Sequence, residues 1–262
     1  MSRSVEIILA IAFGTGVASR AAAAEIVLFT AGAVKKLVSR IEGLFTQATG
    51  HRIKATFDTV GAQRERVEKG ERPDVVILSS ASVAQLSKLG LIDDTSIRDV
   101  GDVEVGLVIA ASGNAQGKSA PDISTPEALR ATLLAAKSIA YADPARGATA
   151  GAHFAKVLTT LGINDTMANR TSVLVFGVEV IEAVAAGKFE LGVSQSSEIV
   201  QHKGVRCLGA LPPPYRLGTR YQVAALKAKP AAASLIEFFC RSALRVTLCG
   251  RAVLQRLNSA RF

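Results

Sequence analysis

Residues 57–78, FDTVGAQRERVEKGERPDVVIL, combine the end of a strand, a small-residue turn, a basic helix, a Gly-to-Pro turn and an apolar strand. Strand-like and helix-like segments alternate in the same way along the chain from residue 25 onward. Because parallel strands need a crossover connection, usually a helix, this order predicts an α/β fold built on a mostly parallel sheet. Helices should cover both faces of that sheet.

The length of the chain suits two modest α/β lobes better than one large sheet. We expect lobe 1 to comprise residues 25–105 with a C-terminal return over residues 221–262, where helices are predicted at residues 231–257. Lobe 2 should comprise residues 106–220. Ligands of open α/β sheets bind beyond the carboxyl ends of the strands, so two such lobes predict a ligand cleft between them.

Residues 1–24 have the features of a secretory signal peptide. Arg3 comes first, an apolar run extends from Ile7 to Ala18, and small residues follow up to Ala24. The run is too short to span a bilayer, so a permanent anchor is the weaker alternative. No later segment has enough unbroken apolar length to cross a membrane, and we expect no membrane partner beyond export.

The chain carries 31 Lys and Arg against 22 Asp and Glu, a formal net charge of +9. Removal of residues 1–24 takes away Arg3, Arg20 and Glu6 and leaves +8. A basic exported protein can bind nucleic acid, a membrane surface or acidic small molecules, although most of this charge fits an ordinary soluble surface. Nucleic acid is disfavoured because Trp is absent and the basic residues are spread out. A small anionic substrate is the expected partner.

The cysteines and histidines predict no metal site. Cys207, Cys240 and Cys249 allow at most one disulfide, for which Cys240–Cys249 is one arrangement and buried free thiols are the alternative. Their spacing to the three histidines does not match a metal-binding pattern. The chain also lacks a phosphate loop, a dinucleotide fingerprint and the elbow of a serine hydrolase. We therefore expect no cofactor.

Four strand-to-helix junctions share one design, an apolar strand followed by a small-residue turn and a helix, at residues 30–33, 59–62, 146–151 and 176–178. The start of a helix has free backbone N–H groups, which bind anions. Ordinary turn chemistry explains any one junction, but four that face one cleft would form a cradle for anionic oxygens. The predicted substrate-binding positions in these turns are Gly32, Ala33, Thr59, Val60, Gly61, Arg146, Gly147, Thr149 and Gly177.

Cations lie beside two of these junctions. Arg64 and Arg66 follow the second junction, and Lys35 follows the first. The helix dipole disfavours cations at a helix start, so these positions favour a docked anion. Arg pairs with carboxylates through two parallel hydrogen bonds, and we predict that Arg64 and Arg146 bind a polycarboxylate. A solvated helix face is the equally weighted alternative for each cation.

Four segments resemble the molybdate-binding-type periplasmic solute-binding proteins of ABC importers: EIVLFTAGAVKKLV, GAQRERVEKGERPDVVILSS, YADPARGATAGAHFAKVLTTLGI and VIEAVAAGKFELGVSQSSEIV. The resemblance covers nearly the whole chain after residue 24. It implies a two-lobed periplasmic-binding-protein fold of type II, a periplasmic location and a cleft that closes on an anion.

Three positions depart from the pattern of the molybdate binders. Serines are usual at the first two turns and a tyrosine after the late strand, whereas this chain has Ala33, Val60 and Gln195. An oxyanion would then meet mainly backbone donors. Together with the nearby cations, these departures favour a larger carboxylate over molybdate, with Gln195 as a further predicted binding residue.

Aconitate isomerases resemble the same family of binding proteins, and this chain is similar to them. The resemblance implies that the chain interconverts cis- and trans-aconitate without a cofactor. The chemistry would be an allylic proton shift, which needs a base near an acidic carbon. Candidate bases are His153 and Lys35, with Asp58 less favoured because a helix cap explains it. The alternative function is a binding protein that delivers a molybdate-like oxyanion or a small polycarboxylate to an ABC permease.

Overall fold

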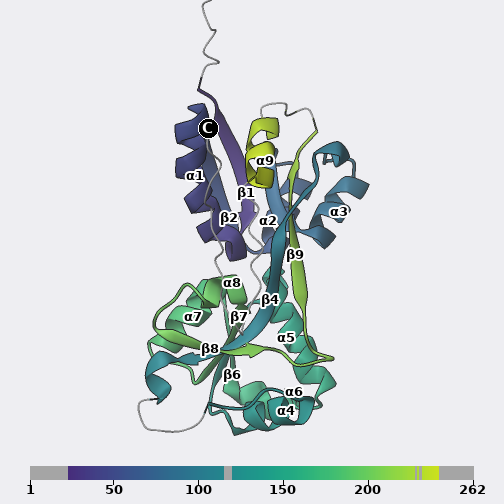
Figure 1. Ribbon diagram of the computed structural model, residues 1–262. Coiled ribbons are helices and arrows are strands. Elements are labelled where there is room, and N and C mark those ends of the chain that lie inside the picture. Colours follow the sequence, from purple (N-terminus) through teal and green to yellow (C-terminus); the bar gives the residue numbers. More distant parts are fainter. Residues whose placement is uncertain (1–22, 115–119, 228, 230–231, 242–262) are drawn as a thin grey trace, which may run out of the picture.

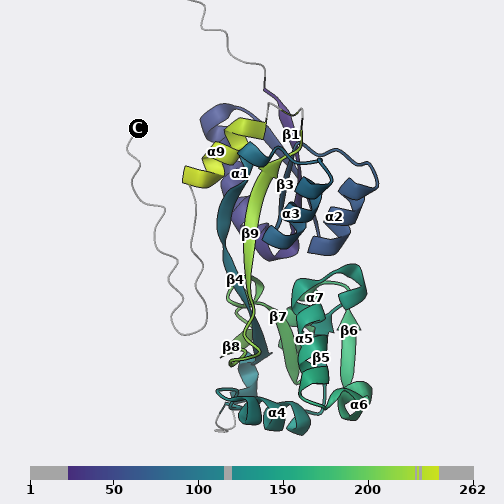
Figure 2. The ribbon, with the colours of Figure 1, turned by 90° about the vertical axis from the view of Figure 1, so that its right-hand side faces the viewer.

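The computed structural model describes residues 23–114, 120–227, 229 and 232–241 (Figure 1). These residues form two lobes, which lie one above the other in Figures 1 and 2. The predicted two-lobed α/β fold is confirmed, with a mostly parallel sheet flanked by helices in each lobe. The predicted signal peptide, apart from its last two residues, and the predicted helical sequence beyond residue 241 lie outside the described residues.

Lobe 1 is a sheet with helices on both faces. Its strands are β1 (Glu25–Ala31), β2 (Arg52–Asp58), β3 (Val75–Ser79), β9 (Gly218–Ala225) and the first half of β4 (Arg98–Ala110). Its helices are α1 (Lys35–Thr49), α2 (Val60–Glu68), α3 (Ser80–Lys88) and α9 (Ala232–Arg241). The strand order is β2-β1-β3-β9-β4, in which only β9 is antiparallel to its neighbours. Helices α1 and α9 cover one face, and α2 and α3 cover the other (Figure 2).

Lobe 2 repeats this plan with shorter strands. They are β5 (Ile139–Ala142), β6 (Thr171–Leu174), β7 (Leu191–Gln195), β8 (Val205–Ala210) and the second half of β4. The helices are α4 (Pro126–Ala135), α5 (Thr149–Thr160), α6 (Asn164–Met167), α7 (Gly177–Ala185) and α8 (Ser196–Ile199). Strand β5 runs parallel to β6 and β7, and β4 runs antiparallel to β7 and β8.

Strand β4 belongs to both sheets. Its residues 98–104 pair with β9, and its residues 105–108 pair with β7. The buried apolar side chains divide at the same point, because one core includes Val103 and the other includes Val105. Figure 2 shows β4 and β9 running side by side from one lobe to the other. A pair of hydrogen-bonded strands therefore connects the lobes.

Local sequence explains the main elements of lobe 1. Helix α1 buries Val38, Ile41 and Phe45, whose spacing of three and four residues forms one apolar face. The helix ends at Gly50, which has a φ of 77° in the left-handed region that glycine adopts without strain. Strand β3 is buried along its whole length, as expected for a strand inside a parallel sheet.

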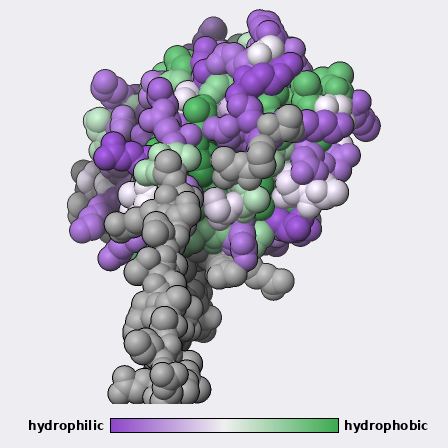
Figure 3. Space-filling view, turned by 90° about the horizontal axis from the view of Figure 1, so that it is seen from above, coloured by the Kyte–Doolittle hydropathy of each residue, from purple (hydrophilic) through white to green (hydrophobic). Residues whose placement is uncertain are grey.

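The surface of lobe 1 is largely polar. Viewed from the lobe 1 end, hydrophilic residues cover most of the surface that the grey atoms leave visible, with smaller hydrophobic areas between them (Figure 3). None of the helices in the described part of the chain is long and apolar enough to cross a membrane.

The Cys240–Cys249 disulfide, one of the arrangements compatible with the sequence, is absent. Cys240 on α9 is an exposed free cysteine, so the Cys240–Cys249 bond does not form. Cys207 on β8 is disulfide-bonded. Cys249 lies outside the described residues.

Candidate functional site

A cleft of about 510 Å³ lies between the lobes. Strands β1 and β2 of lobe 1 and β5, β6 and β7 of lobe 2 each end at this cleft, followed by a helix or a helical turn. The starts of α2, α5 and α7 and the turn before α1 therefore face the same space, as the four junctions predict. Among the predicted site residues, those that line the cleft are Gly32, Ala33, Lys35, Thr59, Val60, Thr149, Gly177 and Gln195.

Two cations line the lobe 1 wall of the cleft. Lys35 and Lys36 begin α1, and the Lys35 Nζ atom lies 5.5 Å from the centre of the Phe57 ring. Both lysines are exposed, and neither forms an ion pair within the described part of the chain. Their charge is therefore available to an anion in the cleft.

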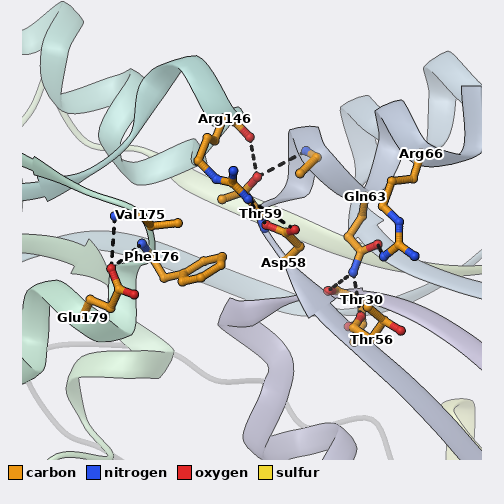
Figure 4. Close-up of polar contacts among 11 residues, drawn as sticks. Thr30, Thr56, Asp58, Thr59, Gln63, Arg66, Arg146, Val175, Phe176 and Glu179 are labelled. Atoms are coloured by element: carbon orange, nitrogen blue, oxygen red, sulfur yellow. Dashed lines mark hydrogen bonds and ion pairs between the residues drawn. The ribbon is translucent and has the colours of Figure 1, made fainter. Parts of the chain in front are cut away.

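Residues of the second and third junctions contact each other directly. The Arg146 Nη2 atom lies 3.1 Å from Asp58 Oδ1, and the Thr59 hydroxyl donates to the Arg146 carbonyl oxygen (Figure 4). The Gly61 N–H donates to the Gly147 carbonyl oxygen at 3.2 Å. These five residues form what we call the interlobe latch. Gly61, Arg146 and Gly147, predicted as substrate-binding residues, do not line the cleft because their polar groups join the two lobes.

A second hydrogen bond joins the two lobes. The Ser197 hydroxyl on α8 donates to the Ala33 carbonyl oxygen at 2.6 Å. Both residues are buried. The lobes are thus held together at two places, and the structure represents a closed arrangement of the cleft.

The predicted role of Arg64 as a cleft residue is not supported by its position. Its Nη1 atom donates to Gln85 Oε1 at 2.7 Å, and its Nε atom lies 3.1 Å from Glu68 Oε1. Arg66 similarly pairs with Glu71 at 2.7 Å. The physical reason is local, because acidic side chains a few residues away on α2 and in the next turn compete for these arginines.

His153 also lies away from the cleft. Its Nε2 atom is 2.7 Å from the Tyr215 carbonyl oxygen within lobe 2. A carbonyl only accepts, so this ring nitrogen carries the hydrogen in that bond. Asp58, the less favoured candidate base, accepts from the Thr59 N–H and from Arg146. Of the predicted bases, Lys35 and Asp58 line the cleft and His153 does not.

Glu198 is a cleft residue that the sequence-based prediction missed. It lies on α8, directly after β7, and its carboxylate accepts from the Ser194 hydroxyl at 2.6 Å. Burial raises the pKa of Glu198, and hydrogen bonds from Ser194 and from the Gln195 backbone partly oppose this effect. A signal was present in the sequence, since Glu198 is the one charged residue in the segment LGVSQSSEIV.

The side chain of Gln195 is the other unusual polar group of the cleft. It is 5% exposed, and neither its Oε1 nor its Nε2 atom has a hydrogen-bond partner in the described structure. A buried amide without partners carries a substantial free-energy cost, which a bound ligand can remove. Tyr221, which also lines the cleft, is buried, and this burial together with the charge of Glu198 raises the pKa of its phenol.

The geometry of the cleft offers anion binding and two carboxylates, of which Asp58 is paired with Arg146 and Glu198 has no ion pair within the described residues. Within the described residues, no group of three or more His, Cys, Asp or Glu side chains is placed to hold a metal ion. The donors in the cleft include lysines, backbone N–H groups at helix starts, the Thr149 hydroxyl and the Gln195 amide.

A two-lobed α/β fold with a ligand cleft between the lobes is typical of solute-binding proteins. The profile of the bacterial extracellular solute-binding protein family matches residues 26–242, and the chain belongs to this family. An aconitate isomerase from a Pseudomonas species is 25% identical over 190 residues, which cover 71% of this chain and 69% of that protein.

Solved structures of molybdenum-related proteins share the fold. The periplasmic molybdate-binding protein of Azotobacter vinelandii is 19% identical, with a TM-score of 0.64 over 82% of this chain and 91% of that chain. The substrate-binding domain assigned to a molybdenum ABC transporter of Clostridium difficile is also 19% identical, with a TM-score of 0.60 over 83% and 92%. At this level of identity they establish the fold alone.

Proposed function

We propose that this chain is a secreted isomerase that interconverts cis- and trans-aconitate without a cofactor. The similarity to an aconitate isomerase supports this function. The observation that carries the proposal is the composition of the cleft, which has unpaired lysines on one wall, helix starts on both walls and apolar side chains between them. A carbon skeleton that bears several carboxylates complements this combination.

The size of the cleft favours an organic anion over a compact oxyanion. Its volume of about 510 Å³ falls in the range of roughly 300–1,000 Å³ that is typical of sites for organic ligands. Phe57, Phe176 and Ile181 give its walls apolar surface. Ala33 and Val60 present methyl groups at positions where the resemblance to molybdate binders predicts hydroxyls.

The expected contacts distribute the substrate carboxylates over the cleft. Lys35 and Lys36 attract carboxylates from the lobe 1 side, together with the backbone N–H groups of the turn that precedes α1. On the lobe 2 side, Thr149, Gly177 and Gln195 supply hydroxyl, backbone and amide donors. The substrate thus bridges the lobes and stabilises the closed arrangement.

The reaction needs no redox partner. A base removes a proton from the methylene carbon of aconitate, and the electron pair of the C–H bond spreads over the adjacent double bond and carboxylate. The same base returns the proton to the carbon that was vinylic, so that the double bond moves by one position. Whether the new double bond is cis or trans depends on the conformation in which the cleft holds the two arms of the substrate. Donors aimed at the carboxylates stabilise the charge of the intermediate.

The test is to incubate the purified protein with trans-aconitate and to follow the cis isomer by proton NMR. We expect conversion to an equilibrium mixture without added metal or cofactor. Lys36→Ala should raise KM by about tenfold, the effect of losing one charge-assisted contact of about 1.4 kcal/mol. Lys69→Ala is the matched control, because Lys69 pairs with Glu65 on the surface of α2. Absence of conversion would refute the proposal.

The alternative is a binding protein that delivers an anion to an ABC permease. Membership of the solute-binding protein family and the closed arrangement of the lobes favour it. It requires tight binding without turnover. Nanomolar binding of molybdate or tungstate by calorimetry, combined with no conversion of aconitate, would support this function over the isomerase.

A further inference from the structure

We propose that the carboxylate of Glu198 is the general base of the isomerisation and that the Gln195 amide beside it holds a substrate carboxylate. This inference deepens the proposed aconitate isomerase function and rests on it. It assigns the proton transfer to a residue that neither the junction motifs nor the pattern of cations singles out.

Glu198 lines the cleft between the lobes. Gly177 makes room for it there, and Gly32 lies opposite. A methyl group added at Gly177, the first residue of α7, would lie 2.4 Å from Glu198 Oε2. One added at Gly32, in the turn after β1, would lie 3.5 Å from Glu198 Oε1. The carboxylate thus packs against the backbone of α7 in lobe 2 and faces the turn after β1 in lobe 1, where a substrate that bridges the lobes must pass.

The hydrogen bonds of Glu198 orient the carboxylate without neutralising it. Its Oε2 atom accepts from the hydroxyl of Ser194, the second-last residue of the preceding strand β7. No ion pair of Glu198 occurs among the described residues. Asp58 is different, because its carboxylate is already engaged by Arg146 at 3.1 Å and by the Thr59 N–H. Burial also raises the pKa of Glu198, which makes its carboxylate a stronger base than an exposed one.

Gln195 supplies independent evidence for a ligand next to Glu198. Its side chain lines the cleft and is 5% exposed, and both of its amide atoms lack a partner in the described structure. A substrate carboxylate would accept from the Nε2 group and remove the cost of burying it. Gln195 and Glu198 lie three residues apart at the start of α8. We therefore expect that a substrate carboxylate bound by the Gln195 amide places the adjacent methylene carbon of the substrate close to Glu198.

Two bases predicted from the sequence, His153 and Lys35, are less suitable by geometry. The His153 Nε2 atom is engaged with the Tyr215 carbonyl oxygen and does not line the cleft. Lys35 lies at the exposed start of α1, over the Phe57 ring, and we assign it to a substrate carboxylate.

Glu198 alone can accept the proton and return it, so the reaction needs no second acid or base. One carboxylate oxygen forms an O–H bond as the methylene C–H bond breaks, and the electron pair enters the allylic system of the substrate. The resulting carboxylic acid then gives its proton to the former vinylic carbon, which restores the carboxylate. In D2O the acid exchanges with solvent between these two steps, so turnover should place deuterium on the substrate carbon.

The experiment compares Glu198→Gln with the wild type in D2O by NMR and calorimetry. We expect turnover to fall by at least about a hundredfold and deuterium incorporation to fall with it. Affinity for trans-aconitate should change by less than about threefold, since the amide is nearly isosteric and can still accept from Ser194. Glu182→Gln is the matched control, because Glu182 is exposed on α7.

A second variant separates a chemical role from a structural one. Glu198→Ala should be inactive, and added formate should restore part of the turnover by acting as the missing base. Turnover of Glu198→Gln above half that of the wild type would overturn the inference while leaving the isomerase function intact. Joint loss of binding and turnover without formate rescue would also overturn it. A wild type without turnover would instead refute the proposed function itself.

Discussion

Gly61→Ala should hold the two lobes apart without weakening either of them. Gly61 lies on α2 and faces Gly147 across the interlobe latch. A methyl group at position 61 would lie 2.7 Å from the Gly147 Cα atom and 3.1 Å from the Arg146 carbonyl oxygen. Both neighbours are backbone atoms, which cannot rotate away as a side chain can.

The size of the effect follows from this overlap. Carbon atoms pack at about 3.5–4.0 Å, so the lobes must separate locally by about 1 Å to admit the methyl group. Overpacking of this kind costs about 1–3 kcal/mol, which corresponds to a loss of about 5- to 150-fold in the affinity of a ligand that binds the closed arrangement. The effect on folding has the opposite sign, because alanine favours a helix over glycine by about 0.5–1 kcal/mol.

Calorimetry with trans-aconitate, thermal unfolding and small-angle scattering together check this prediction. The variant should bind more weakly, unfold at the same or a higher temperature, and keep a larger radius of gyration in the presence of ligand. Gly43→Ala is the matched control, because a methyl group at Gly43 on α1 meets no atom within 4 Å. It should raise thermal stability and leave binding unchanged.

Wild-type affinity in a folded Gly61→Ala protein would refute the reasoning. It would show that the ligand does not need the latch contact between Gly61 and Gly147. A lower unfolding temperature would also contradict it, because it would mean that the methyl group damages lobe 1 itself.

Three further variants test other parts of the site. Arg64→Ala should change the affinity for aconitate by less than twofold, because Arg64 pairs with Glu68 rather than facing the cleft; a tenfold loss in calorimetry would contradict this. His153→Ala should keep its turnover while losing about 0.5–1.5 kcal/mol of stability with the bond to Tyr215, measurable by urea unfolding. Glu198→Gln should be more stable than the wild type at pH 8. Burial raises the folded-state pKa of Glu198. The wild type therefore has its full stability below the unfolded pKa and loses part of it as pH rises through the folded pKa, where the buried carboxylate becomes charged. The difference in unfolding temperature should shrink towards pH 4, and a constant difference would contradict the assigned cause.

The sequence predicted the fold well where the pattern is local. The alternation of apolar strands and amphipathic helices identified β1 to α3 and, in lobe 2, β5, α5, β6 and α7, because each of these elements carries its own periodicity. The pairing of β9 between β3 and β4 was not predictable in the same way, since it joins residues as distant as Val75 and Ala225. Helix α4 was missed altogether, although Thr125 and Pro126 provide a good start for it.

The candidate site was predictable as backbone but not as side chains. Turns after parallel strands must meet at one edge, so Gly32, Val60 and Gly177 reached the cleft as expected. The direction of a long side chain depends on its competitors, which is why Arg64 turned to its neighbours on α2 and α3. Glu198 forms no motif, and its environment exists only after β7 and the starts of α1 and α7 come together.

The central place of β9 in the sheet of lobe 1 has a consequence for the order of folding. Lobe 2 is formed by a continuous stretch that ends before residue 218, whereas lobe 1 lacks a strand until residues 218–225 have been synthesised. Until then β3, whose five residues are all buried in the finished protein, presents an unpaired apolar edge. The N-terminal lobe is therefore the last to complete its fold, and the nascent chain is most exposed to aggregation during that interval.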